Sequence, residues 1–308
     1  MPTLKSYFLK KGIQLGVRRL KRKKTLKVTG VEEQRQLLNS TAKRWIKMPP
    51  NCTVESAQIE GMYCEWISNK QTVKNKVILY LHGGAYGYCS ADTHRTLAAR
   101  IMIESGVKVL LPEYRLAPEH PFPAAPEDTL VIYHWLLDQG YEPSNIIFAG
   151  DSAGGGLSVA STLLLRDRNE PLPAAVICLS PWADLTSSGP SYSKNREKDP
   201  YLNPELVKVA AQAYAGSESL DHNLISPVFA DFSGFPPLYI QVGSIEILLS
   251  DAEKLAQQAK LAGVNVTLTV WKGMWHVFQM SQSIPEAKQA VKEISEFVKK
   301  TFELGHTT

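Results

Sequence analysis

The sequence feature that most constrains this chain is a serine between glycines, Gly150-Asp151-Ser152-Ala153-Gly154. Four apolar residues precede it and apolar residues recur at helical spacing after it, so it joins a predicted buried strand to a predicted buried helix. A strand that turns directly into a helix brings backbone against the bend, which favours Gly150 and Gly154. The bend presents the serine hydroxyl, and we favour a nucleophile at Ser152 over a helix cap.

From residue 77 onwards, short apolar runs alternate with segments of helical periodicity. Strands are predicted at residues 77–81, 107–111, 145–149, 174–179, 237–242 and 266–271, and helices at 93–104, 125–139, 155–168, 250–262 and 284–302. A hairpin is predicted before them from residues 54–59 and 62–67. This order indicates an α/β fold with a mainly parallel sheet covered on both faces. We expect the functional site at the carboxyl ends of the strands.

Two regions depart from this alternation. The first fifty residues contain two predicted amphipathic helices, one within residues 1–30 and one at 31–45. Their predicted inward residues are Leu9, Ile13, Val17 and Leu20 in the first helix and Leu37, Leu38, Ala42 and Trp45 in the second. More than fifty residues also separate the strand at 174–179 from the one at 237–242, with a helical run at 204–214. An excursion of this length is typical of a lid or a substrate-binding insertion.

Charge is distributed unevenly along the chain. Residues 1–30 hold ten Lys or Arg and no acid, whereas the rest of the chain holds 24 basic and 30 acidic residues. A basic amphipathic helix can lie on an anionic membrane surface or on nucleic acid. We favour packing of its apolar side on the protein, with a weak membrane-surface contact as the alternative, and we predict no nucleic-acid partner.

No apolar stretch approaches eighteen residues, and the N-terminus lacks the apolar core of a signal peptide, so the sequence predicts a cytoplasmic protein without a spanning helix. The cysteines are Cys52, Cys64, Cys89 and Cys178. They form no C-x-x-C pair and have no metal-ligand spacing, which predicts free thiols and no metal site.

A serine hydroxyl needs a base to take its proton and a third group to orient that base. Of the seven histidines, His276 follows the last predicted strand and precedes the final helix, at the edge where Ser152 is presented. His134 lies inside a predicted helix, which favours a structural role, and His306 lies in the polar C-terminal tail.

The acid is expected in the loop after the preceding strand, where Glu246 and Asp251 compete. Ser250 and Glu253 have the spacing of a capping box, which gives Asp251 a local role in the first turn of a helix. Glu246 has no such role, so we choose it as the acid and keep Asp251 as the alternative.

Acyl transfer also requires amides that stabilise an oxyanion. His82-Gly83-Gly84-Ala85 directly follows the strand at 77–81, and its glycines allow bare backbone to approach a substrate. The predicted donors are Gly83, Gly84 and Ala153, and His82 is predicted to brace the loop.

These motifs, together with the segments 114–124, 180–184, 234–238 and 274–278, resemble the bacterial hormone-sensitive-lipase-type esterases of the α/β-hydrolase fold. The resemblance implies hydrolysis of small-molecule esters with short to medium acyl chains, without a cofactor, and makes a homodimer unsurprising. It maps the catalytic residues to Ser152, His276 and Glu246. It also implies a helical cap from residues 1–50 and 183–226 over a hydrolase core of residues 51–182 and 227–308.

Two residues depart from the family pattern. Ala85 stands where the family has a third glycine, and Glu246 stands where the family usually has aspartate. Within 114–124, prolines indicate an extended loop, and an ion pair between Arg115 and Glu119 is predicted to brace it. Two alternative functions remain, a membrane-associated lipase and a catalytically silent ligand-binding relative.

Overall fold

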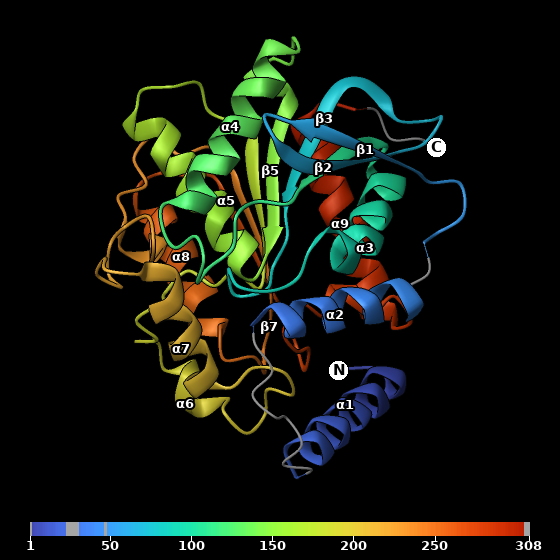
Figure 1. The fold of residues 1–308 in the computed structure, drawn as a ribbon, viewed down its shortest axis with the longest axis vertical. Coiled ribbons are helices and arrows are strands. Elements are labelled where there is room, and N and C mark those ends of the chain that lie inside the picture. Colours follow the sequence, from blue (N-terminus) through green and yellow to red (C-terminus); the bar gives the residue numbers. More distant parts are fainter. Residues whose placement is uncertain (1, 23–30, 46–47, 305–308) are drawn as a thin grey trace.

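The computed structural model describes residues 2–22, 31–45 and 48–304. Within these residues lies an eight-stranded sheet in the order β1-β2-β4-β3-β5-β6-β7-β8 (Figure 1). Its strands are β1 (Thr53–Ile59), β2 (Met62–Ser68), β3 (Val73–Leu81), β4 (Val107–Pro112), β5 (Ile146–Asp151), β6 (Ala175–Leu179), β7 (Leu238–Gly243) and β8 (Val266–Trp271). The β1–β2 and β2–β4 pairs are antiparallel and the other pairs are parallel. The predicted α/β fold with a mainly parallel sheet is confirmed.

Helices cover both faces of the sheet. The helices in the described residues are α1 (Leu4–Arg22), α2 (Val31–Trp45), α3 (Ala91–Ser105), α4 (Ala124–Asp138), α5 (Ala153–Asp167), α6 (Ser191–Lys194), α7 (Pro204–Ala215), α8 (Leu249–Leu261) and α9 (Pro285–Thr301). Of these, α4, α5 and α8 cover one face of the sheet, and α3 and α9 cover the other. Successive residues of a strand point to opposite faces. Val77 and Leu79 of β3 therefore join the core cluster of α4, α5 and α8, whereas Ile78 and Tyr80 join the cluster of α3 and α9.

Between residues 48 and 304 the chain also forms three single turns of 3-10 helix, η1 (Pro143–Asn145), η2 (Pro227–Phe229) and η3 (Phe278–Met280). These turns and the four-residue α6 were not predicted, because elements this short have no readable periodicity. The predicted hairpin of β1 and β2 is confirmed. Its two connecting residues, Glu60 and Gly61, both have positive φ, which suits a tight two-residue turn.

The N-terminal helices and the helices of the insertion (residues 183–226) lie in the lower half of Figure 1, where α1, α2, α6 and α7 are labelled. Leu9 and Ile13 of α1 pack against a core cluster that contains Met274 and Trp275. The prediction that Leu37 and Leu38 point inward is wrong, since they are 64% and 43% exposed. The side chains of Val17, Leu20, Ala42 and Trp45, like the whole of His306, lie outside the described part of the chain. The division into cap and core stays a prediction.

All four cysteines lie in the described part of the chain and are free thiols, as predicted. None of the described helices combines the length and the apolar composition that crossing a membrane demands.

Candidate active site

The bend that carries Ser152 is strained. β5 ends at Asp151, α5 begins at Ala153, and Ser152 between them has φ 53° and ψ −120°, a conformation that L-residues rarely adopt. A Cβ at Gly154 would lie 1.9 Å from the carbonyl oxygen of Leu81, and one at Gly150 would lie 2.3 Å from that of Gly154. The close backbone therefore requires both glycines.

Ser152, His276 and Glu246 form a hydrogen-bonded line. Ser152 Oγ lies 3.0 Å from His276 Nε2, and His276 Nδ1 lies 2.7 Å from Glu246 Oε2. Because an ionised carboxylate can only accept, the imidazole carries its proton on Nδ1 and Nε2 accepts from the serine hydroxyl. The three residues follow β5, β7 and β8, so the parallel sheet brings together side chains up to 124 positions apart.

The Glu246 side chain is fully buried and is held by other hydrogen bonds. Ser180 Oγ donates to Glu246 Oε1 over 2.9 Å, and the amide of Gly243 donates to the same oxygen. The insertion holds the backbone of this loop: Asn195 Nδ2 donates to the carbonyl of Glu246 over 2.9 Å, and Asp199 Oδ2 accepts from the amide of Ile247 over 2.9 Å. The carboxylate is therefore fixed before a substrate arrives.

Asp251, the alternative acid, has other partners. Its Oδ2 accepts from the amide of Asp184 over 2.9 Å and from the hydroxyl of Tyr192 over 3.1 Å. Burial, and then the charge of Asp184, raise the pKa of Asp251 well above its ordinary value. The predicted capping box is wrong: α8 begins one residue earlier, at Leu249, without a side-chain cap. The Ser250 hydroxyl instead accepts from an amide of the insertion, that of Ser191.

The pKa of His276 is set by opposing effects. Burial alone lowers it, because a desolvated imidazolium is disfavoured. The hydrogen bond and charge of Glu246, together with the charges of Asp199 and Asp151, outweigh burial. The pKa of His276 therefore lies above its ordinary value.

The loop predicted to bind the oxyanion, residues 82–85 and hereafter the oxyanion loop, is anchored to the residue beside the serine. The amide of Gly83 donates to Asp151 Oδ1 over 3.2 Å, and a Cβ at Gly83 would lie 2.3 Å from Asp151 Oδ2. Gly84 has φ 118°, and a Cβ there would lie 2.1 Å from the carbonyl oxygen of Tyr88. In the described part of the chain, the amides of Gly84 and Ala153 have no protein acceptor. Of the three predicted donors, Gly84 and Ala153 are therefore the two whose amides remain available to a ligand.

A buried ion pair lies under this loop. His94 Nε2 is 3.2 Å from Asp151 Oδ2, and both side chains are almost fully buried. Burial opposes both charges, but each partner stabilises the other, so the pKa of His94 is raised and that of Asp151 is lowered. In the sequence, His94 is one of seven histidines, and no pattern predicts a role for it. Nothing local in its helix indicates that it reaches Asp151, 57 positions away.

His82 braces the loop in a neutral form. Its Nδ1 donates to the carbonyl of Gly83 over 2.7 Å, and its ring stacks on Tyr114 with centroids 4.4 Å apart. Burial, and then the charge of His94, lower the pKa of His82 to about 4. His134 is 43% exposed on α4 and pairs with Glu170, which fits a structural role.

The loop at 114–124 is braced differently from the prediction. Arg115 pairs with Asp128 at 2.7 Å, not with Glu119. Glu119 instead pairs at 2.8 Å with Arg35 of α2, which also donates to the carbonyl of Gly87 over 2.8 Å. The predicted Arg115–Glu119 pair is wrong because sequence proximity cannot reveal a partner on another helix.

A mostly apolar cavity of about 470 Å³ adjoins the oxyanion loop. It lies between α2, α7 and two loops, and its lining includes Ala85, Tyr88, Pro118, Val209 and Ala213. Ala85, which stands where the family has a third glycine, therefore forms part of the wall of this cavity. In the stretches described here, no three His, Cys, Asp or Glu side chains cluster in a way that could hold a metal ion.

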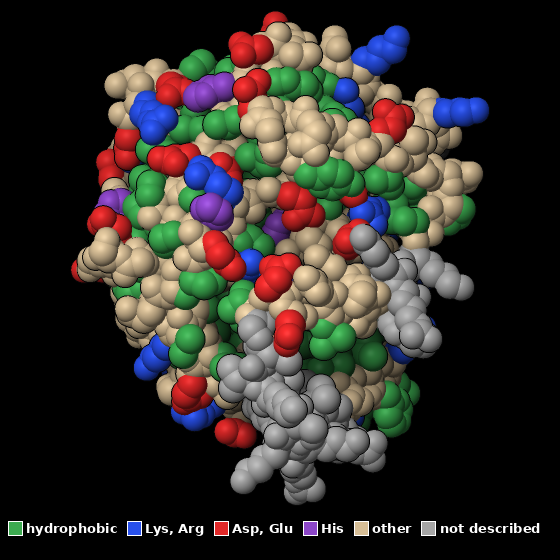
Figure 2. Space-filling view, viewed as in Figure 1, with side chains coloured by type: hydrophobic (Ala, Val, Ile, Leu, Met, Phe, Trp, Pro, Cys, Tyr) green, Lys and Arg blue, Asp and Glu red, His purple; other side chains and the backbone are tan. Residues whose placement is uncertain are grey.

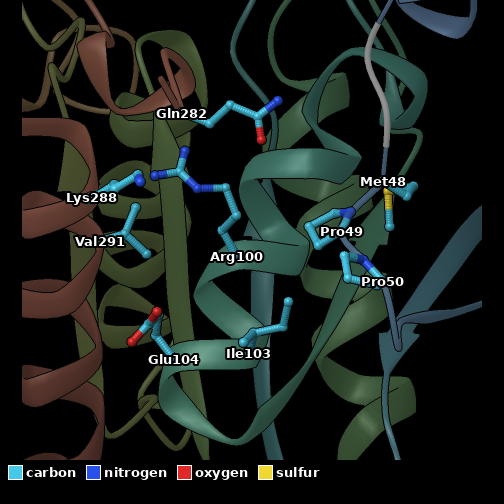
Figure 3. A pocket seen from close by; sticks show the side chains of 9 residues that line it. All are labelled: Met48, Pro49, Pro50, Arg100, Ile103, Glu104, Gln282, Lys288 and Val291. Atoms are coloured by element: carbon cyan, nitrogen blue, oxygen red, sulfur yellow. The ribbon is translucent and has the colours of Figure 1, made fainter. Parts of the chain in front are cut away.

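A second cavity, of about 560 Å³, lies between α3, α9 and residues 48–50 (Figure 3). Like the lining of the first cavity, its lining includes none of Ser152, Glu246 and His276, but it does not adjoin the oxyanion loop. Arg100 projects into it, but the guanidinium donates to the carbonyls of Gln279 and Ala287. These hydrogen bonds of Arg100 therefore join α3 to η3 and to the start of α9.

Comparison with known proteins agrees with this architecture. Residues 78–280 match a family model described as the alpha/beta hydrolase fold. An acetyl-hydrolase of Streptomyces hygroscopicus is 41% identical over 236 residues, which cover 76% of this chain and 79% of that protein. An esterase of Acinetobacter venetianus is 36% identical over 250 residues, covering 80% and 82% of the two chains.

Solved structures give the same result. An esterase from the bacterial hormone-sensitive lipase family superposes with a TM-score of 0.90 at 40% identity, covering 98% of this chain and 100% of that one. This chain therefore belongs to the α/β-hydrolase family, among the bacterial hormone-sensitive-lipase-type esterases.

Proposed function

We propose that this esterase hydrolyses carboxylic esters with short to medium acyl chains through an acyl-enzyme on Ser152. The observation that carries the proposal is the unbroken hydrogen-bonded line from Ser152 through His276 to Glu246, with distances of 3.0 and 2.7 Å. The geometry matches the nucleophile, base and orienting acid that ester cleavage needs at neutral pH.

In the first step, Ser152 Oγ attacks the ester carbonyl while His276 Nε2 takes the hydroxyl proton. The tetrahedral intermediate collapses, its bond to the alcohol oxygen breaks, and His276 returns the proton to the departing alcohol. In the second step, a water gives a proton to His276 and attacks the acyl carbonyl. The acid leaves and Ser152 Oγ recovers its proton. Glu246 stabilises the imidazolium that forms in each step.

The developing oxyanion accepts hydrogen bonds from the amides of Gly84 and Ala153, which have no other acceptor in the described structure. Gly83, the third predicted donor, would first have to release Asp151 Oδ1. In this proposal Gly83 and the Asp151–His94 pair hold the oxyanion loop in place, and the amides of Gly84 and Ala153 stabilise the oxyanion.

The cavity beside Ala85 is our candidate for the acyl chain, because it is mostly apolar and adjoins the oxyanion loop. Replacing Ala213 by tryptophan fills part of it. On a panel of esters from acetyl to octanoyl, A213W is expected to lower kcat/KM for the longer chains about tenfold more than for acetyl.

The matched control for this panel is K208W, which adds the same side chain at an exposed position of α7 outside the cavity lining. It should leave the chain-length profile unchanged. If A213W lowered kcat/KM equally for all esters, the acyl chain would bind elsewhere. If wild type cleaved no ester of the panel, the proposed function would be wrong.

The pH dependence of kcat/KM tests the base. His276 must be neutral to accept the serine proton, and its pKa is raised, so activity should fall as pH drops through a midpoint above 6.5, the ordinary value. Because the Asp199 charge helps to raise that pKa, D199N should move the midpoint to lower pH. H134Q, at an exposed histidine, should not move it. A wild-type midpoint below 6.5 would contradict the assignment.

A further inference from the structure

Helix α1 exposes long apolar side chains on its outer side. Leu4 is 78% exposed, Phe8 68% and Tyr7 46%. Leu4 and Phe8 are four residues apart, so they share one face of the helix. A surface helix normally turns such residues toward the core and leaves polar ones outside. The outer side of α1 therefore has the composition of a contact surface.

The inner side of α1 already holds the helix in place. Leu9 and Ile13 pack on the cluster of Met274, Trp275, Phe278 and Ile284. The amide of Thr3 donates to Glu286 Oε1 over 2.6 Å, and the Ser6 hydroxyl donates to the same oxygen over 3.0 Å. Leu4, Tyr7 and Phe8 are thus not needed to attach the helix, and the attachment fixes which side faces outward.

Cations are interleaved with these apolar residues. Lys5 and Lys11 are exposed, and the ammonium groups of Lys10 and Lys11 lie 6.0 and 5.8 Å from the ring centroid of Tyr7. Residues 1–30 hold ten cations and no acid, although acids outnumber cations in the rest of the chain. On the face shown in Figure 2, by contrast, acidic and basic side chains are interspersed over the body.

We propose that α1 docks this enzyme on anionic membrane surfaces. Leu4 and Phe8 enter the boundary between headgroups and acyl chains, Tyr7 lies at headgroup level, and the lysines pair with lipid phosphates. Charge complementarity selects this occupant. A second copy would bring two basic helices together, and nucleic acid would leave Leu4 and Phe8 without an apolar partner.

The docking surface adjoins the catalytic loop. A Cβ at Gly273 would lie 2.9 Å from Pro2 Cγ, so Pro2, two residues ahead of the start of α1, packs on the loop that carries His276. Trp275, next to His276, belongs to the cluster that holds Leu9 and Ile13. Docking through α1 therefore places this loop close to the bilayer, where esters dissolved in the membrane become accessible. Only this last consequence rests on the proposed function.

The test is co-sedimentation of the full-length protein with vesicles of phosphatidylcholine alone or mixed with phosphatidylglycerol. Wild type should bind the anionic vesicles at low salt, bind neutral ones at least tenfold more weakly, and lose affinity as salt rises. The double variant L4E/F8E should bind anionic vesicles at least tenfold more weakly than wild type. K10E/K11E should show a comparable loss with a smaller salt dependence.

The matched control is L261E on α8, where the leucine is 75% exposed. It should bind vesicles like wild type. Because Leu4 and Phe8 are exposed, L4E/F8E should keep the thermal midpoint and the turnover of a water-soluble ester, which separates docking from catalysis.

Three results would overturn the proposal. The first is equal binding of wild type and L4E/F8E to anionic vesicles, and the second is absence of vesicle binding by wild type. The third is a difference in molar mass between wild type and L4E/F8E in light scattering, which would show that this side of α1 contacts a second copy of the protein.

Discussion

Replacing Ser152 by alanine should lower kcat for an activated short-chain ester by about 10³-fold or more. Ser152 Oγ is the oxygen that lies 3.0 Å from His276 Nε2, and alanine leaves no atom there to form the acyl-enzyme. The backbone strain at φ 53° is the same for alanine and serine, so the variant should unfold at nearly the wild-type temperature. Steady-state kinetics and a thermal melt measure the two effects.

The matched control is S161A, in the helix that follows. Ser161 is buried and its hydroxyl has no hydrogen-bond partner among the described residues, so its removal should change neither turnover nor stability by much. A sulfonyl fluoride should label wild type on the peptide that contains Ser152 and should leave S152A unlabelled. Near wild-type turnover in S152A would end the proposed mechanism, whatever the outcome for the fold.

Replacing Glu246 by glutamine should lower kcat by about 10³- to 10⁴-fold. Glutamine has nearly the same shape, but it can no longer stabilise the imidazolium, and its amide can donate to Nδ1 and favour the wrong tautomer of His276. The hydrogen bonds from Ser180 and Gly243 to Oε1 should keep the side chain in position. The loss is therefore expected in kcat, with little change in KM.

The matched variant is D251N. The raised pKa of Asp251 favours the neutral carboxyl group, which asparagine resembles, so its turnover should stay within about tenfold of wild type. Its main effect should be on stability, through the hydrogen bonds to Asp184 and Tyr192. If D251N lost activity and E246Q kept it, the acid of the mechanism would be Asp251.

The sequence determined the elements of the core. Strand alternation and helical spacing arise from burial against neighbouring layers, so the runs that became β3 to β8 and α3 to α9 were readable wherever they were long enough. The bend at Ser152 could be predicted from the sequence for a steric reason. A Cβ would lie 2.3 Å from a backbone oxygen at Gly150 and 1.9 Å from one at Gly154, so both positions require glycine. Chain order after parallel strands also indicated that Ser152, Glu246 and His276 would share one edge, although their chemical roles stay predictions.

Only the tertiary structure decided which polar groups meet. Local pattern suggested that Arg115 would pair with Glu119 and that Ser250 would cap its own helix, but both groups have partners from distant segments, Asp128 and Ser191. The same holds for the His94–Asp151 pair under the oxyanion loop and for Asp199 of the insertion, which holds the loop of Glu246.

The physical reason is one of range. Apolar periodicity is a property of a single segment and its nearest layer, so a sequence displays it directly. A buried polar group needs a specific partner at about 3 Å, and any of many distant segments can supply that partner once the chain has folded. The exposed side of α1 follows the same rule. Helical spacing predicts that Leu9 and Ile13 form an apolar side, and these residues pack on a core cluster. Only the tertiary structure shows that Leu4 and Phe8 form a second apolar side that stays exposed.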